Sequence, residues 1–458
     1  MLKHLVIVAA LSASVLLPAG ARAQDLLSIW HAAAEHDLQL DVARADHGAS
    51  ETLRDQAAAL GRPQVGITLG AGLGADDVTM RGARFSAPGM GQFDGARFAT
   101  SVNGGLATRL GIVARQPLID AARDAQQAEL RLSADMGDTA WRDARTALMM
   151  TTAERYFALA VAEERVRVMQ QQVDAFKQAQ AEAHERYRIG AAPVTDTHEA
   201  DAALASAEAQ LAAAQLQSGT SRRVLADSTG LARPHAALPA TEPAEVQNWP
   251  YWEQAVQADN PRLRLLTQAI AVSEQKLHEQ SVAGRPVVDL VARASQDRLA
   301  GGGDFGSAAN RHIDGMVGVQ ITIPLGIDGM PEAREREAVM HLEKARAELD
   351  LARQQVGQQA YAAWDGLQAG TAQVKALAQG LKANAARLDA TRLGHEVGDR
   401  TTLDVLNAEN AYTEAQLALA QARSDQVLTR LRLAALADQL NEGVLGQVNA
   451  TLERRSQQ

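Results

Sequence analysis

The polar residues best placed to do chemistry follow two glycine turns. Asp196 follows Gly190, and Arg400 and Asp404 follow Gly398. The dipole of a helix favours an acid in its first turn, so each aspartate has a role simply by starting a helix. An arginine also makes charge-assisted hydrogen bonds with a carboxylate through its planar guanidinium group. These residue types therefore predict ion pairing and hydrogen bonding, not the making or breaking of bonds.

No group of residues in the sequence resembles a catalytic centre. The chain has no cysteine, no glycine-rich phosphate loop with a lysine and no paired metal-ligand motif. Its 11 histidines are scattered and fit solvated helix positions. We therefore expect no enzyme activity, no cofactor and no metal. A formal net charge of −10 also argues against nucleic acid as a partner.

The N-terminus has the pattern of a secretory signal peptide. Lys3 precedes an apolar stretch over residues 5–17, which is followed by the breakers Pro18 and Gly20 and by a small-residue cleavage pattern at 21–23. About thirteen apolar residues are too few for a membrane-spanning helix, which needs about twenty. We expect residues 1–23 to be removed on export, leaving no N-terminal cysteine for a lipid anchor.

Two copies of one design follow, over residues 24–230 and 251–447, with a proline-rich connector at 231–250 and a polar tail at 448–458. Each copy is expected to form a helix, a strand pair, a very long helix, a turn and a shorter helix. The repeated positions include Trp30 and Trp252, Asp37 and Asn260, Gly61-Arg62-Pro63 and Gly284-Arg285-Pro286, Pro117 and Pro324, and Gly190 and Gly398.

The predicted helices suit a wall of uniform height. Their apolar residues alternate in steps of three and four, which is typical of coiled coils. Residues 118–187 would span roughly 105 Å, and residues 25–60 and 195–230 roughly 54 Å each, so two short helices match one long helix. An ordinary soluble coiled coil remains an alternative at this point.

Four segments have the alternating pattern of strands, the first over about ten residues: 65–74, 106–115, 287–297 and 317–323. Arg109, Arg115, Asp289 and Arg293 would share one face. Beyond residue 23 no apolar run is long enough for a membrane helix, so a membrane-spanning part would consist of strands. Four strands cannot close a barrel, which needs about eight, so several chains would share one. A hairpin packed on helices in the periplasm is the alternative.

Aromatic residues at the bilayer interfaces would be few. Phe85, Phe93 and Phe98 are expected in a glycine-rich loop between the first two strands, and Phe305 in the loop between the other two. Each could serve as an interfacial belt residue or as a loop residue.

The sequence from about residue 24 to about residue 447 resembles the TolC family of outer-membrane channels. The resemblance is strongest in VGDRTTLDVLNAENAYTEAQLALAQARSDQVLTRLRLAALADQLNEGVL from Val397 and in YRIGAAPVTDTHEADAAL from Tyr187. It implies a mainly α chain with a small β portion: a long coiled-coil α-helical barrel and a transmembrane β-barrel shared by three chains.

The resemblance also implies a periplasmic gate at the two turns, whose glycines are Gly190 and Gly398. By position, Arg400 would be the latch cation that bonds Thr195 and the carboxylate of Asp196. Two positions depart from the family pattern: His395 replaces a latch tyrosine, and Asn407 replaces one of two ring aspartates, leaving Asp404. Histidine ordinarily titrates near pH 6.5, so His395 is either a pH-sensitive latch residue or a solvated turn residue.

The implied function is that of a homotrimeric exit duct, in contact with outer-membrane lipid, for proteins (type I secretion) or small molecules (multidrug efflux). Its partners would be a periplasmic adaptor and an inner-membrane ABC or proton-driven transporter. The alternative from another class is a periplasmic coiled-coil adaptor or scaffold. The sequence does not identify the cargo, although an N-terminus without a lipid anchor favours protein secretion or general multidrug export.

Overall fold

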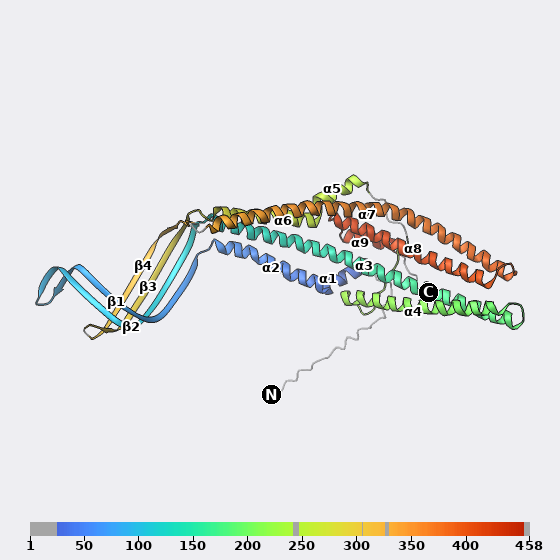
Figure 1. Ribbon diagram of the computed structural model, residues 1–458, viewed down its shortest axis with the longest axis horizontal. Helices are drawn as coiled ribbons and strands as arrows, with labels where there is room; N and C mark the ends of the chain where they lie inside the picture. The colour runs from blue at the N-terminus through green and yellow to red at the C-terminus, as the bar shows by residue number, and fades with distance from the viewer. Residues whose placement is uncertain (1–24, 241–246, 305, 326–328, 453–458) are drawn as a thin grey trace, which may run out of the picture. The chain divides into compact units, whose positions relative to one another are not determined.

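The structure is a computed structural model that describes residues 25–240, 247–304, 306–325 and 329–452 (Figure 1). The expected signal peptide, Phe305 and the last six residues of the tail lie outside the described residues. The chain divides into two compact units. Unit 1 holds residues 1–45, 139–264 and 351–458, and unit 2 holds residues 46–138 and 265–350.

Unit 2 contains a four-stranded antiparallel sheet (Figure 1). The strands are β1 (Gln64–Ala87), β2 (Gly91–Ile119), β3 (Val287–Gly303) and β4 (Gly306–Thr322), in the order β1-β2-β3-β4. Each strand has its chain neighbours beside it, so β1 and β4 are the two edges of the sheet. The expected strand pairs and the mainly α character of the chain are confirmed.

The first two strands are much longer than the ten residues expected from the sequence. β1 has 24 residues and β2 has 29, because their pairing continues through register shifts after Gly74 and Met80. The expectation that Phe85, Phe93 and Phe98 lie in a loop is therefore wrong. Phe85 pairs with Phe93 across the two strands, and the turn at Gly89, whose φ is 83°, lies beyond them. β2 also continues to Ile119, beyond residue 115, where the expected segment ends.

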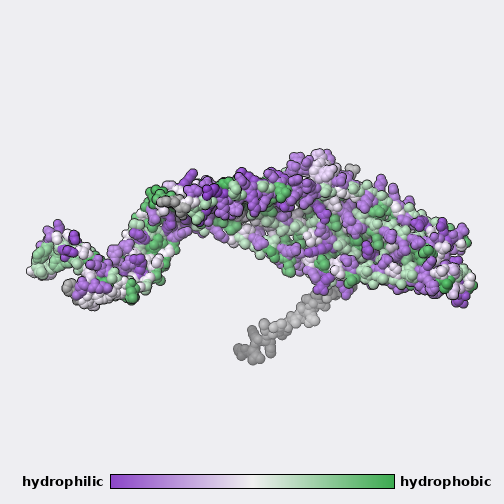
Figure 2. All heavy atoms as spheres, in the orientation of Figure 1, coloured by the Kyte–Doolittle hydropathy of each residue, from purple (hydrophilic) through white to green (hydrophobic). Residues whose placement is uncertain are grey.

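The register gives the sheet two different faces, because successive side chains of a strand point to opposite sides. One face carries the exposed apolar residues Val65, Ile67, Leu69, Leu73, Leu106, Leu110, Ile112, Leu290, Ile313, Val317, Val319 and Ile321. The other carries Arg109, Arg115, Asp289, Arg293, Asp297 and Asp314. The prediction that Arg109, Arg115, Asp289 and Arg293 share a face is confirmed. Figure 2 shows hydrophobic residues at the surface of the strands.

Helices make up most of the rest: α1 (Leu26–His36), α2 (Leu38–Leu60), α3 (Ala121–Arg188), α4 (Val194–Thr229), α5 (Trp249–Asp259), α6 (Pro261–Val282), α7 (Met330–Glu396), α8 (Thr402–Leu436) and α9 (Glu442–Thr451). Apolar residues at the predicted three-four spacing are buried, among them Leu159, Met169 and Val173 of α3 and Leu349 and Val356 of α7. No helix in the described part of the chain is long and apolar enough to cross a membrane.

Two helices that the sequence predicts as single are each broken at a capping residue. Asp37 separates α1 from α2: its carboxylate accepts a hydrogen bond from the Gln39 backbone N–H (2.8 Å) and another from the Arg155 guanidinium (3.1 Å). Asn260 separates α5 from α6 in the same way. Its side chain accepts from the Leu263 N–H (3.1 Å) and donates to the Leu436 carbonyl (2.8 Å). Both capping side chains are buried, so the breaks belong to the packed interior.

The main core of unit 1 packs around Trp30, Tyr156, Phe157, Leu431 and Leu445. The Tyr156 hydroxyl accepts a hydrogen bond from the Ala237 N–H (3.0 Å), which ties the start of the connector to α3. α9 is a helix that the sequence analysis missed. Through its Asn449 side chain, which accepts from the Leu26 N–H (2.8 Å), it binds the start of α1.

Candidate gate at the helical turns

Two helical hairpins of unit 1, α3–α4 and α7–α8, end in turns of the same type. Gly190 and Gly398 have φ values of 77° and 87°, in the left-handed region that favours glycine. After each glycine the chain folds back on its helix: the Ala191 N–H donates to the Arg186 carbonyl (2.7 Å) and the Asp399 N–H to the Gly394 carbonyl (2.8 Å). These bonds close the C-terminal end of each long helix.

Asp404 lies in the first turn of α8 and forms a capping box with Thr401, the N-cap residue. The Thr401 hydroxyl accepts from the Asp404 N–H (3.1 Å), and the Asp404 carboxylate accepts from the Thr401 N–H (3.0 Å). The hydrogen bond from the Thr401 backbone, with that from its hydroxyl, lowers the pKa of Asp404, and the charge of Arg400 adds to the effect. Asp404 therefore has a structural role at the helix start. Asn407 lies exposed on the same helix.

Asp196 joins the two hairpins through a threonine. Its carboxylate accepts a hydrogen bond from the Thr402 hydroxyl (3.3 Å), whose residue is buried. Within the described residues of this single chain, Arg400 forms no ion pair with Asp196 and no hydrogen bond with Thr195. The latch that the resemblance implies stays a prediction. The structure identifies Thr402, which the sequence analysis missed, as the partner of Asp196.

His395 lies between the hairpins and is not a solvated turn residue, since its side chain is only 12% exposed. Its Nδ1 is 2.9 Å from the Arg400 carbonyl oxygen. Its Nε2 is 3.1 Å from Nη1 of Arg186 and 3.3 Å from the Glu182 carboxylate. The His395 ring therefore bridges α3 and the second turn.

Polar pairs continue along the hairpins away from the turns. Arg392 donates to Glu409 (2.8 Å), which is mostly buried, and Gln172 donates to the Asn410 side chain (2.6 Å). Burial raises the pKa of Glu409, and the nearby Arg392 opposes the shift. Such pairs give α3, α7 and α8 a defined register next to the candidate gate.

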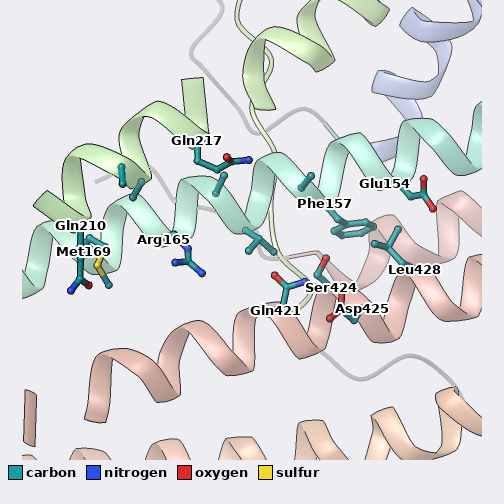
Figure 3. A pocket seen from close by; sticks show the side chains of 15 residues that line it. Glu154, Phe157, Arg165, Met169, Gln210, Gln217, Gln421, Ser424, Asp425 and Leu428 are labelled. Atoms are coloured by element: carbon teal, nitrogen blue, oxygen red, sulfur yellow. Dashed lines mark hydrogen bonds between the residues drawn. The ribbon is translucent and has the colours of Figure 1, made fainter. Parts of the chain in front are cut away.

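A cavity of about 510 Å³ lies between α3, α4 and α8 (Figure 3). Its wall mixes apolar residues such as Phe157 and Met169 with charged residues such as Glu154, Arg165 and Asp425. The wall carries no histidine or cysteine. In the part of the chain that the structure describes, no cluster of three or more His, Asp or Glu residues could hold a metal ion. The geometry is that of a groove between packed helices.

Long helical hairpins and a two-faced antiparallel sheet give this chain the fold of solved outer-membrane channels. Among solved structures, CusC superimposes with a TM-score of 0.71 at 15% identity and covers 90% of this chain and 92% of its own. The open state of MtrE from Neisseria gonorrhoeae gives 0.68 at 18% identity, with 91% and 90% coverage.

The sequence model of the outer membrane efflux protein family matches residues 29–231 and 252–438, and the chain belongs to this family. The outer membrane efflux protein BepC of Brucella suis is 30% identical over 265 residues, 58% of this chain and 57% of BepC. The alkaline protease secretion protein AprF of Pseudomonas aeruginosa is 25% identical over 442 residues, with 95% and 89% coverage. TolC of Escherichia coli is 23% identical over 443 residues, with 94% and 86% coverage.

The protein is therefore an outer-membrane exit duct with an extended periplasmic portion, and not an enzyme. Family membership favours this function over the periplasmic adaptor that the sequence left open.

Proposed function

We propose that three copies of this chain form one continuous duct through the outer membrane, closed at its periplasmic end by the turns of the helical hairpins. The observation that carries the proposal is the open, two-faced sheet. β1 and β4 each have one neighbour, so each presents an unpaired backbone edge. Such an edge is not tolerated in lipid, because its N–H and C=O groups would lack partners.

Closure therefore needs strands from other chains. Four strands fall short of the roughly eight that a closed barrel requires, and the TolC-family resemblance implies twelve strands from three chains. The exposed apolar face suits lipid, and the face with arginines and aspartates suits a water-filled lumen.

Assembly gives the first prediction. Cross-linking of the purified protein in mild detergent should yield one discrete species of three chains, because only the closed barrel pairs both sheet edges. The species should break down to single chains when heated in denaturant. A stable single chain that conducts ions in planar bilayers would rule out the shared barrel.

The contacts between the two hairpins support the proposal of a gate. Thr402 joins Asp196, and His395 joins Arg186, so the α7–α8 turn is held against α3 and the start of α4. Opening the duct would require these hydrogen bonds to break. Arg400 and Thr195, next to them in sequence, complete the proposed latch.

A second prediction concerns pH. On protonation, both ring nitrogens of His395 would carry a hydrogen, and Nε2 would form an ion pair with Glu182, its acidic neighbour in place of the expected Asp196. The positive charge of Arg186 would oppose this change, and the Glu182 side chain is 53% exposed, so we expect only a modest tightening of the gate. Single-channel conductance should be lower at about pH 5.5 than at about pH 7.5 in the wild type. The variant His395→Phe should lack this difference, and an identical pH response in both proteins would exclude a switch.

The proposed cargo is a secreted protein, a small molecule or both. AprF is named for secretion of an alkaline protease and BepC for efflux, and both resemble this chain. A periplasmic adaptor and an energised inner-membrane transporter would supply the cargo. Deleting the gene and measuring both a secreted protein and drug susceptibility would separate the two roles.

A further inference from the structure

Arg298 and Arg311 lie directly opposite each other on β3 and β4, on the apolar face of the sheet. Arg298 is eight residues after Leu290 on β3, and every second residue of a strand points to the same side, so both side chains lie on the apolar face. The Arg311 guanidinium confirms it by donating to the Gln296 side chain on the same face (2.9 Å). Along β3 this face carries no charge from Val288 until Arg298.

No acid balances this pair of cations. The cross-strand neighbour of Arg298 on β2 is Thr108, and the next positions on this face hold Ala300 and Ala309. Within the described residues neither arginine forms an ion pair, and both are exposed. Like charges directly opposite each other destabilise a sheet, so a bound anion would relieve a cost that the chain otherwise carries.

The distance of the arginine pair from the start of β3 matches the height of the apolar band of a membrane barrel. Val288 is near the end of β3 that follows α6, and Arg298 is about ten residues further along. At about 3.3 Å per residue and a tilt near 40°, this distance corresponds to about 25 Å, the height of the apolar band of outer-membrane barrels. The arginines therefore follow the apolar band where headgroups would begin.

We propose that Arg298 and Arg311 bind a phosphate group of an outer-leaflet glycolipid of the lipid A type. This inference rests on the proposed function, because it requires the apolar face to contact lipid and the strand ends to point outward. Two planar guanidinium groups can each donate two parallel hydrogen bonds to phosphate oxygens, which gives a site both charge and shape. The site would anchor the barrel at an interface where the chain has few aromatic residues.

The test compares three probes on the purified oligomer in mild detergent: lipid A, dephosphorylated lipid A and inorganic phosphate. Lipid A should raise the temperature at which the oligomer dissociates, and native mass spectrometry should detect the bound lipid. The double variant Arg298→Ala/Arg311→Ala should weaken lipid A binding by about tenfold or more, because both charge-assisted contacts are lost. The control Lys375→Ala/Lys382→Ala removes the same charge from exposed positions of α7 and should bind as the wild type does.

Each alternative outcome is decisive. An equal response to dephosphorylated lipid A would overturn the phosphate site and leave only apolar contact. An equal response to inorganic phosphate would overturn the lipid assignment. If the alanine variant fails to assemble, Arg298→Gln/Arg311→Gln, which keeps polar side chains, should assemble and show the same loss. If the oligomer conducts ions but does not bind lipid A, only this inference is wrong. If the chain never forms an oligomer, the proposed function is wrong.

Discussion

Replacing Arg115 with alanine should destabilise the assembled sheet strongly. Arg115 donates to Asp289, whose side chain is 0% exposed, and one Asp289 oxygen already lacks a hydrogen-bond partner among the described residues. Loss of the arginine would leave a buried carboxylate without its counter-charge, which costs about 3 kcal/mol or more. We expect the oligomer to dissociate at a clearly lower temperature on gels of unheated and stepwise-heated samples.

The same sheet provides a matched control. Arg109 pairs with Asp297 on the same face, but these side chains are 66% and 35% exposed. Arg109→Ala should therefore change the dissociation temperature of the oligomer far less than Arg115→Ala does, because water screens an exposed ion pair. Adding Asp289→Asn to Arg115→Ala should restore much of the stability, since it removes the orphaned charge. Equal effects of the two arginine variants would show that burial of Asp289 does not matter in the assembly.

Breaking the proposed latch should raise conductance through the duct. Asp196→Ala removes the acceptor of the Thr402 hydroxyl and the proposed acceptor of Arg400, and leaves a buried hydroxyl underbonded. Arg400→Ala removes the proposed latch cation. In planar bilayers both variants should open more readily than the wild type, with Asp196→Ala expected to have the larger effect because its contact exists within one chain.

The variant Asp404→Ala is the control that distinguishes opening of the gate from loss of a helix cap. Asp404 caps α8 through Thr401 and makes no hydrogen bond to α3 or α4 within the described residues. Asp404→Ala should weaken the start of α8 without the conductance gain of Asp196→Ala. If all three variants conduct like the wild type, the residues serve the turns alone.

The long helices, the turns and the two faces of the sheet could be predicted from the sequence, because they depend on the spacing of apolar residues and on the positions of glycines. Gly190 and Gly398 are needed for left-handed backbone, and the alternation from Val65 onward fixes which side chains share a face. The strand lengths could not be predicted in the same way. Residues beyond Gly74 are held in β1 by pairing with β2 and not by a clear alternation of their own.

The helix breaks and the partners at the gate depend on tertiary contacts. Asp37 and Asn260 are good capping residues, so their types were a signal for a break, but burial against Arg155 and Leu436 is what selects them. The position of His395 next to Glu182, and not next to Asp196, follows from how two hairpins pack. No spacing along the chain encodes that choice.

The polar face of the sheet carries three arginine–aspartate pairs, joined across strands at Arg109–Asp297, Arg115–Asp289 and Arg293–Asp314. It also carries Asp76, whose carboxylate accepts a hydrogen bond from the Asn310 side chain (3.0 Å) and has no arginine partner among the described residues. In a lumen lined by this face, the fields of the paired charges would cancel at short range, and the Asp76 carboxylate of each chain would leave a small excess of negative charge. Reversal potentials measured across a salt gradient should therefore show a weak preference for cations.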